Sequence, residues 1–436
     1  MTVCGIISEY NPVHKGHEFH IKEARERSGA DFVVAAMSGD FMQRGTPGIA
    51  DKYERAAAAI KAGADMVVML PVCVSTASAE GFARGGVAAL KACLCDYISF
   101  GCEDVEIASP EVRNAVSRLA VSKDHMTYEF KDELIAKSRE GKPYAQAMCE
   151  VYSNILNPVE SALITKLLKT PNNMLAFEYI KALEHFNIDT LKTLPIKRVN
   201  GQYHDLSDGA YSATACRKIM LEWEKGDLDA RLKDMLTEAS YNILNDYVTK
   251  KGFPYIGEED LTAMLHYALL TGDAKEFAKY ADVSEDLANR IENFTINYGS
   301  YTNFADILNT RCMSRARIAR ALLHIVLRIE PEPYISLREK RGDESNLIRP
   351  DGSLSYIRVL AMRPGADELL HRIKKETNTG IVTTLSAVPE DAIYRKYFEQ
   401  DIFASRIYRA AMIQKSKKAF HDDYNRHFLY MRECDD

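Results

Sequence analysis

The chain has 436 residues, of which 46% are apolar and 27% are charged, and its formal net charge is −6. This length exceeds what a single hydrophobic core usually organises, so we expect two or three domains. We expect no membrane span, because no segment approaches the ~20 apolar residues that one needs, and the acidic balance excludes a global attraction to nucleic acid.

Short apolar runs alternate with helical segments over the first hundred residues. The runs cover residues 2–7, 31–37, 65–70 and 96–100. Runs that are apolar throughout and separated by helices predict a parallel sheet covered on both faces, a Rossmann-like α/β arrangement. In such sheets ligands bind beyond the carboxyl ends of the strands. The predicted helices are His17–Arg27, Asp51–Ala62 and Ser78–Leu94.

The most specific pattern is His14-Lys15-Gly16-His17, an HxGH element directly after the first strand and at the start of the first helix. Glycine lets the backbone approach a ligand, the helix N-terminus presents unpaired N–H groups, and two imidazoles converge there. Together they suit a polyphosphate, and His20 follows on the same helix face as His17. These histidines could instead be ordinary loop and cap residues, but the strand–loop–helix context favours function. We expect His14 and His17 to face solvent.

Asp40 lies at the carboxyl end of the second predicted strand. It could bind Mg²⁺, orient Lys52 or Arg55, or shape a pocket for a small acid; as a loop aspartate it could equally cap the next element. Its place in the predicted crevice favours a site role. We therefore take His14, His17 and Asp40 as the catalytic candidates.

The rest of the chain is mainly helical. Pro171 opens a helix, Leu194–Val199 predicts a further strand, and residues 218–330 are helical almost throughout. Residues 331–436 mix short apolar runs with basic helices, which predicts mixed α/β structure. We place domain boundaries near residues 220 and 330.

A second candidate for anion binding lies just before a helical run, in residues 211–217. Ser212 and Thr214 are suitable N-cap residues, and Arg217 would project from the first turn toward the same anion as the HxGH element. These three residues are candidate phosphate contacts. Taken by itself, the pattern more often marks an ordinary helix cap.

Basic residues are concentrated in residues 311–341. This segment contains eight basic and three acidic residues, which gives it a net charge of +5. Arg315, Arg317 and Arg320 would cover much of one helix with positive charge. The final segment adds basic and aromatic residues, a mixture compatible with phosphate contact and base stacking. On charge alone a solvated helix face is the favoured explanation of the arginines.

The nine cysteines are scattered, with no CxxC pair and no regular spacing. This pattern indicates reduced thiols rather than disulfides or a zinc site. We therefore expect a cytoplasmic protein without a metal site of its own.

These residues resemble the bacterial tRNA(Met) cytidine acetate ligase family, which is related to the HIGH-type nucleotidyltransferases. The resemblance covers most of the chain and rests on residues 7–20, 37–45, 52, 55, 78–83, 100–103, 171–173, 197–198, 203–205 and 315–320. The chain departs from the family pattern at Val13, Lys15, Met69, Cys102 and Cys216. None of these departures removes a histidine, a glycine or Arg198.

The resemblance implies a ligase that activates acetate with ATP as acetyl-adenylate, releases diphosphate and acetylates N4 of the wobble cytidine of elongator tRNA(Met). Mg²⁺ is expected with ATP. It implies an ATP-binding nucleotidyltransferase domain at residues 1–220, a helical domain at 221–330 and a tRNA-binding basic region at 331–436, and it favours tRNA contact by Arg315, Arg317 and Arg320. The alternatives are a nucleotidyltransferase acting on a small phosphate or cofactor precursor without RNA, and a non-catalytic RNA-binding protein that senses a nucleotide.

The resemblance also implies a set of ATP contacts. Gly101 would end a strand where a side chain would collide with base or ribose, and Arg198 could grip phosphate bidentately. Asn173 is favoured over Asn172, although either could be a helix cap. The full set is Ile7, Ser8, Glu9, Tyr10, Asn11, Pro12, Val13, His14, Lys15, Gly16, His17, Glu18, Phe19, His20, Gly101, Asn173 and Arg198.

Overall fold

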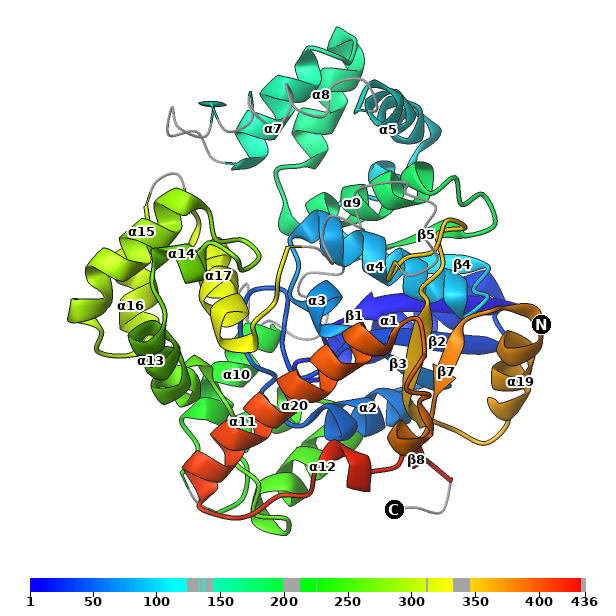
Figure 1. Cartoon of the computed structure of the whole chain (residues 1–436). Coiled ribbons are helices and arrows are strands. Elements are labelled where there is room, and N and C mark those ends of the chain that lie inside the picture. Colours follow the sequence, from blue (N-terminus) through cyan, green and yellow to red (C-terminus); the bar gives the residue numbers. More distant parts are fainter. Residues whose placement is uncertain are drawn as a thin grey trace.

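The computed structural model describes residues 1–123, 133, 136–137, 144–198, 212–224, 226–310, 313–331 and 346–432. Five parallel strands form one side of its sheet, in the order β5-β4-β1-β2-β3 (Figure 1). They are β1 (Val3–Ser8), β2 (Phe32–Ser38), β3 (Met66–Leu70), β4 (Tyr97–Cys102) and β5 (Lys192–Lys197). The predicted Rossmann-like parallel sheet is confirmed.

The C-terminal segment extends the same sheet. Strand β6 (Tyr356–Met362) pairs antiparallel with β3, and β7 (Gly380–Val382) and β8 (Leu429–Tyr430) both pair parallel with β6. The predicted mixed α/β character of the C-terminal region is therefore confirmed. The sheet nevertheless crosses the predicted boundary near residue 330, so the described part of residues 331–436 is continuous with the first domain.

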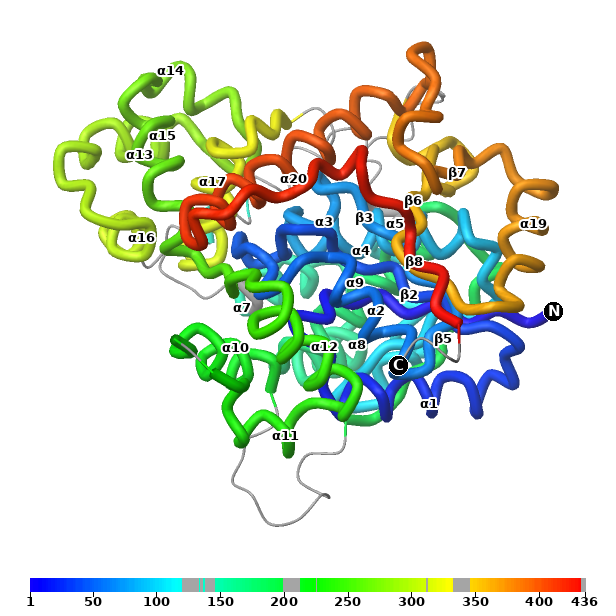
Figure 2. The backbone as a smooth tube through the Cα atoms, turned by 90° about the horizontal axis from the view of Figure 1, so that it is seen from below, coloured from blue at the N-terminus to red at the C-terminus, as the bar shows by residue number. Residues whose placement is uncertain are grey.

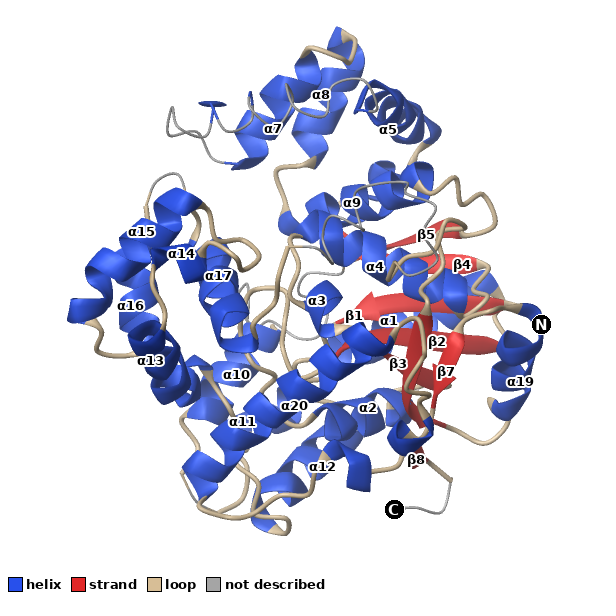
Figure 3. Cartoon of the chain, in the orientation of Figure 1, coloured by secondary structure: helices blue, strands red, loops and turns tan. Residues whose placement is uncertain are grey.

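Helices cover both faces of the sheet, as Figure 3 shows. On one face α1 (Lys15–Ser28) and α2 (Lys52–Lys61) bury Ile21 and Ala56 against strand residues such as Ile6 and Val67. On the other face lie α4 (Ala79–Ala92) and α9 (Pro171–His185). Burial on both faces is why the strands are apolar at almost every position. Helix α4 approaches closely because a Cβ on Gly86 would lie 2.6 Å from Ile7.

Two helical groups flank this core. Between β4 and α9 the chain forms η1 (Val105–Ala108), α5 (Pro110–Lys123), α7 (Tyr144–Ser153) and α8 (Pro158–Leu167), and these three α-helices lie together at the top of Figure 1. After β5 come α10 (Ala213–Leu221), α11 (Arg231–Met235), α12 (Glu238–Thr249), η2 (Glu258–Leu261), α13 (Thr262–Thr271), α14 (Ala274–Phe277), α15 (Glu285–Phe294), η3 (Thr295–Asn297), α16 (Tyr301–Leu308) and α17 (Arg315–Leu327). The helical character predicted for residues 218–330 is confirmed where the structure describes them.

The remaining elements are α3 (Val72–Ser75), α19 (Asp367–Glu376), η4 (Leu385–Ala387), α20 (Arg395–Ser416) and η5 (Asp423–Asn425). Of these, α3 and α20 lie at the carboxyl ends of β2 and β3, since Asp401 of α20 accepts the N–H of Val72 and Ser405 of α20 donates to Asp40. Helix α20 contacts both α3 and α17, and Figure 2 shows it running between the helical group of α13–α17 and the sheet. The C-terminal segment thus lies beside the edge of the sheet where ligands are expected.

Candidate active site

The loop from β1 to α1 brings three imidazoles together. His14 is the N-cap residue of α1, and its backbone N–H donates to Nδ1 of His17 at 3.2 Å. The two rings stack with centroids 3.7 Å apart, and Tyr10 meets His17 edge-on at 5.0 Å. His20 lies one turn later, with its Nε2 2.9 Å from the Ser99 hydroxyl on β4. The expected convergence of the histidines at the carboxyl edge is confirmed.

The sequence predicted that His14 and His17 face solvent. This prediction is wrong for His14, which is only 7% exposed. His17 is partly buried. Burial, together with the positive charge of Arg198, lowers the pKa of His14 to about 4 and that of His20 to about 4. Burial and the neighbouring His14 lower the pKa of His17 well below its usual value. All three imidazoles are therefore neutral near pH 7, and each has one N–H to donate.

The second predicted element folds against this loop. Arg217 donates from Nη1 to the backbone oxygen of Asn11 at 2.8 Å and from Nη2 to the Thr214 hydroxyl at 3.0 Å. Ser212 caps α10 by accepting the N–H of Ala215 at 3.2 Å. The cap and the approach of Arg217 to the loop are both present, and phosphate contact by these residues stays a prediction.

Gly101 and Arg198 lie together at the ends of β4 and β5. A Cβ on Gly101 would be 3.4 Å from Cγ of Arg198, so the glycine leaves the space above this strand end open. Arg198 is exposed, and its Nη1 donates to the Oδ1 atom of Asn172 at 3.2 Å. Asn172, which was not favoured from the sequence, is thus the asparagine that contacts Arg198.

Asn173 connects α9 to the turn after β4. Its Oδ1 accepts the backbone N–H groups of Glu103 at 3.0 Å and Asp104 at 3.2 Å. In return, Glu103 accepts the backbone N–H of Asn173 at 3.0 Å. Thr170, rather than either asparagine, is the N-cap residue of α9. Asn173 therefore has a structural contact, and its contact with ATP stays a prediction.

Several polar atoms around the loop are buried without a partner among the described residues. They are Tyr10 Oη, Asn11 Nδ2, His14 Nδ1 and Ser38 Oγ. Leaving a buried polar group unsatisfied costs about 1–3 kcal/mol. The protein itself encloses these four atoms, so the fold bears this cost in the segments that adjoin the HxGH loop.

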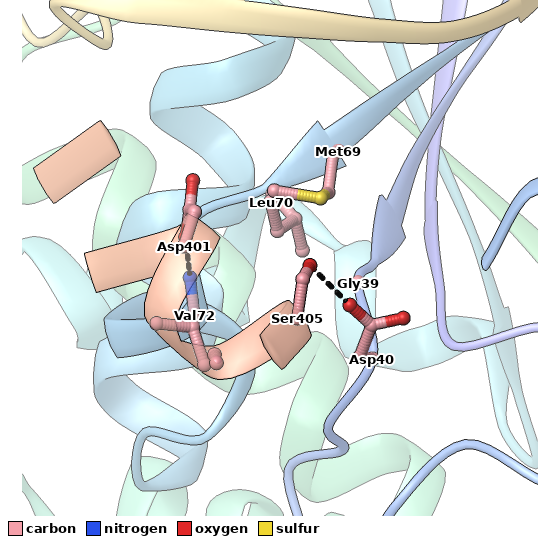
Figure 4. Close-up of a pocket in the computed structure, with 8 residues that line it drawn as sticks. Gly39, Asp40, Met69, Leu70, Val72, Asp401 and Ser405 are labelled. Atoms are coloured by element: carbon pink, nitrogen blue, oxygen red, sulfur yellow. Dashed lines mark hydrogen bonds between the residues drawn. The ribbon is translucent and has the colours of Figure 1, made fainter. Parts of the chain in front are cut away.

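Asp40 takes part in a buried ionic network. Its Oδ2 accepts from Lys52 Nζ at 2.8 Å and from the Ser405 hydroxyl at 2.6 Å. Lys52 also pairs with Asp423 at 2.8 Å, and the two carboxylates hold the pKa of Lys52 above its usual value although burial lowers it. Figure 4 shows Asp40 pointing toward Ser405 beside a small cavity that Asp401 also lines. Of the roles predicted for Asp40, the contact with Lys52 is present.

Arg55 is a supporting residue to which the sequence pattern gave no defined role. Its guanidinium is 1% exposed and donates to four backbone oxygens and, among the described residues, to no carboxylate. The acceptors are Ala50, Glu9 at the end of β1, and Ser38 and Gly39 at the end of β2. A buried arginine therefore joins the two strand ends from which the loops of the site depart.

The arginines of α17 are less available than the sequence suggested. Arg315 pairs with Glu258 at 2.8 Å and Asp306 at 3.0 Å. Arg320 is only 8% exposed and pairs with Asp282 at 2.9 Å. Arg317 is partly exposed and has no ion pair within the part of the chain that the structure describes. The prediction that these arginines form a cationic helix surface is therefore wrong for Arg320, which is buried. At Arg315 the positive charge is largely neutralised by its two ion pairs.

Among the described residues, no group of three or more His, Cys, Asp or Glu side chains could hold a metal ion. The seven cysteines in this part of the chain are free thiols. None of the described helices is long and apolar enough to cross a membrane.

The fold and this loop together define a HIGH-type nucleotidyltransferase. Residues 1–423 match the profile of the family described as HIGH Nucleotidyl Transferase, and the chain belongs to this family. Its relatives include the tRNA(Met) cytidine acetate ligase of Thermoanaerobacter sp. (strain X514), 32% identical over 414 residues that cover 94% of this chain and 96% of the relative. The ligase of the same name from Listeria monocytogenes serovar 1/2a is 33% identical over 420 residues, 94% of each chain.

Solved structures agree with these sequence relationships. Apo TmcAL of Thermotoga maritima (form I) is 26% identical and has a TM-score of 0.83, with 99% of this chain and 100% of that chain covered. The same protein bound with alpha-thio ATP has a TM-score of 0.79 at the same coverage. The family predicted from the sequence is confirmed.

Proposed function

We propose that this chain is an ATP-dependent ligase that activates acetate as acetyl-adenylate, releases diphosphate and acetylates N4 of the wobble cytidine of elongator tRNA(Met). The observation that carries the proposal is the convergence of His14, His17, Arg198 and Arg217 on one loop at the carboxyl edge of the sheet. Relatives that match nearly the whole chain bear the name of this activity.

ATP fits the loop by charge and by hydrogen bonding. Its base and ribose would lie over Gly101, and its phosphates would accept from donors of residues 7–20 and from Arg198, with Asn173 supporting the same side. Ser212, Thr214 and Arg217 would approach the phosphates from α10. Mg²⁺, which commonly binds through substrate phosphates, would supply further neutralisation of the phosphate charge.

The chemistry needs positioning more than a protein nucleophile. One acetate oxygen would attack the α-phosphorus in line as the bond to diphosphate breaks, and the neutral His14 and His17 would donate hydrogen bonds as charge develops. In the second step the cytidine N4 would form a bond to the acetyl carbon, with AMP leaving and one proton released. Asp40 stays a catalytic candidate, acting through its contact with Lys52.

The RNA is expected to bind away from this loop. We propose that residues 221–330 and 331–436 carry the tRNA contacts, with Arg317 the strongest candidate on α17 because Arg315 and Arg320 are ion-paired. If Arg317 contacts a phosphate, Arg317→Ala flattens the salt dependence of tRNA affinity by about 0.7 to 0.9 in slope. We place this activity in the cytoplasm.

One experiment separates the alternatives. The protein is incubated with ATP, labelled acetate and total tRNA, acetate-dependent ATP–pyrophosphate exchange is measured without tRNA, and the tRNA nucleosides are then analysed. We expect exchange with acetate and label in N4-acetylcytidine. Exchange with a small phosphate compound alone would favour the RNA-independent nucleotidyltransferase, and a complete lack of exchange would favour a non-catalytic binding protein.

A further inference from the structure

The turn after β2 is held rigidly against the helical group. Met42 and Thr46 are joined by a backbone hydrogen bond of 2.8 Å, and Gly45 donates to the Met42 oxygen at 3.0 Å. Gly45 has a φ of 78°, and a Cβ there would lie 2.4 Å from the backbone of Ala319 on α17. The turn therefore packs on α17 so closely that only glycine fits next to Arg44.

The same turn is tied to the HxGH loop. The backbone N–H of Gln43 donates to Oε1 of Glu9 at 2.9 Å, and the N–H of Ile49 donates to Oδ1 of Asn11 at 2.7 Å. Asn11 is also the residue whose backbone oxygen accepts from Arg217. Arg44 thus directly follows a residue that is hydrogen-bonded to the start of the proposed ATP loop.

Arg44 brings a positive charge to this turn. Its side chain is exposed, and it makes no ion pair with any residue that the structure describes. Arg217 has a lowered pKa, mainly because of burial, and the positive charge of Arg44 contributes to the lowering while Glu9 opposes it. Glu258 also acts on Arg217, but it pairs with Arg315 at 2.8 Å, so Arg44 and Arg217 together bring more positive charge to the loop than Glu9 offsets.

We propose that Arg44 binds the β- and γ-phosphates of ATP, the diphosphate that leaves on activation; this assignment rests on the proposed function. The sheet order places Gly101 and Arg198 at β4 and β5, on one side of β1, and Arg44 after β2, on the other side. A nucleotide with its base over Gly101 passes its phosphates along the HxGH loop toward Arg44. A planar guanidinium binds phosphate bidentately, whereas an ammonium acts as a point charge.

The test measures ATP and AMP binding by calorimetry, without acetate or tRNA. We compare wild type, Arg44→Ala and Arg44→Lys with Arg27→Ala, which removes an exposed arginine from the opposite end of α1. Arg44→Ala should weaken ATP binding about tenfold or more and leave AMP binding within about twofold. The ATP affinity of Arg44→Lys should lie between those of wild type and Arg44→Ala. Arg27→Ala should bind ATP and AMP as wild type does.

Two outcomes would overturn the assignment. Equal weakening of ATP and AMP would mean that Arg44 maintains the loop rather than contacting the terminal phosphates. Unchanged ATP binding would place Arg44 outside the nucleotide site, and a loss confined to tRNA acetylation would then make it an RNA contact. A wild type that binds neither nucleotide would instead disprove the proposed function, so the two failures are distinguishable.

Discussion

The three histidine side chains of the HxGH loop and the start of α1 are neutral hydrogen-bond donors. His14 is buried and stacked on His17, and His20 is held by Ser99. Protonation of His14 or His20 to an imidazolium is unfavourable, because burial and the positive charge of Arg198 both disfavour the charged form. The loop therefore suits electrostatic stabilisation of phosphate charge rather than proton transfer.

We predict that His17→Asn lowers acetate-dependent ATP–pyrophosphate exchange on the order of 10²-fold. Asparagine can still accept the His14 N–H, so the start of α1 should be kept. The control is His371→Ala, which removes an exposed histidine from α19. Exchange rates and thermal midpoints are measured for both variants, and exchange close to wild type in the folded His17→Asn protein would contradict a role for His17.

The depressed pKa values predict a loss of stability in mild acid. The pKa of His20 is about 4 in the folded protein, below its usual value. At a pH between these two pKa values, the unfolded chain therefore binds a proton at His20 more readily than the folded protein does. Its contribution to stability is present above about pH 6.5 and falls as the pH drops toward about 4. Urea unfolding should show that His20→Asn loses less stability than wild type between about pH 7 and pH 5. Equal losses of stability in wild type and His20→Asn would contradict the lowered pKa of His20.

At the scale of elements, the first four strands and the helices between them follow from sequence periodicity. Each strand is apolar throughout because it is covered on both faces, and the HxGH pattern marks the loop after β1. Strands β6 to β8 could not be placed, because the pairing of Met66 with Met362 depends on contacts between distant segments. Local patterns carry no information on such a register.

The candidate site was predictable only in part, for the same reason. The histidines are identified by spacing within one loop, and Arg217 by its cap. The partners of Asp40 lie far along the chain, since Ser405 belongs to α20. Arg44 and Arg55 lie within segments that resemble the family. Nothing in their spacing shows that Arg55 donates to backbone oxygens, or that Arg44 has no ion-pair partner in the described part of the chain. The ion pairs of α17 were missed because charge counting does not reveal partners.

Helix α2 depends on Arg55 for its connection to the strand ends. We predict that Arg55→Met lowers the free energy of unfolding by at least about 3 kcal/mol, because four backbone oxygens lose a donor at about 1–3 kcal/mol for each group left unsatisfied. Arg55→Lys should cost less, since an ammonium can still donate to some of them. Urea unfolding provides the measurement, and a loss below about 1 kcal/mol in Arg55→Met would show that the oxygens find other donors.

At the scale of the whole molecule, the C-terminal segment is bound to the first domain by buried charge as well as by the sheet. Asp423 pairs with Lys52 at 2.8 Å and with Arg358 at 2.9 Å, and all three side chains are buried. Lys52 connects this pair to Asp40 at the end of β2. The network joins α2, β6 and η5 across more than 300 residues of sequence.

We predict that Asp423→Asn destabilises the protein by about 3–5 kcal/mol, because it removes the carboxylate that pairs with the buried Arg358 and one of the two that pair with the buried Lys52. The neighbouring Asp422 is a matched control: its partners Arg406 and Arg409 are closer to solvent. Asp422→Asn should cost about 1 kcal/mol or less. Both losses are measured by urea unfolding, and similar values for the two variants would mean that burial of the network adds nothing.

The antiparallel pairing of β6 with β3 also constrains how the protein is made. During synthesis β3 emerges from the ribosome almost 300 residues before its partner. Until then its backbone N–H and C=O groups form an open, apolar sheet edge, which is a template for pairing with other chains. The nascent chain therefore passes through a long interval in which the nucleotide-binding half is present but unfinished, and this interval is when it most needs protection from aggregation.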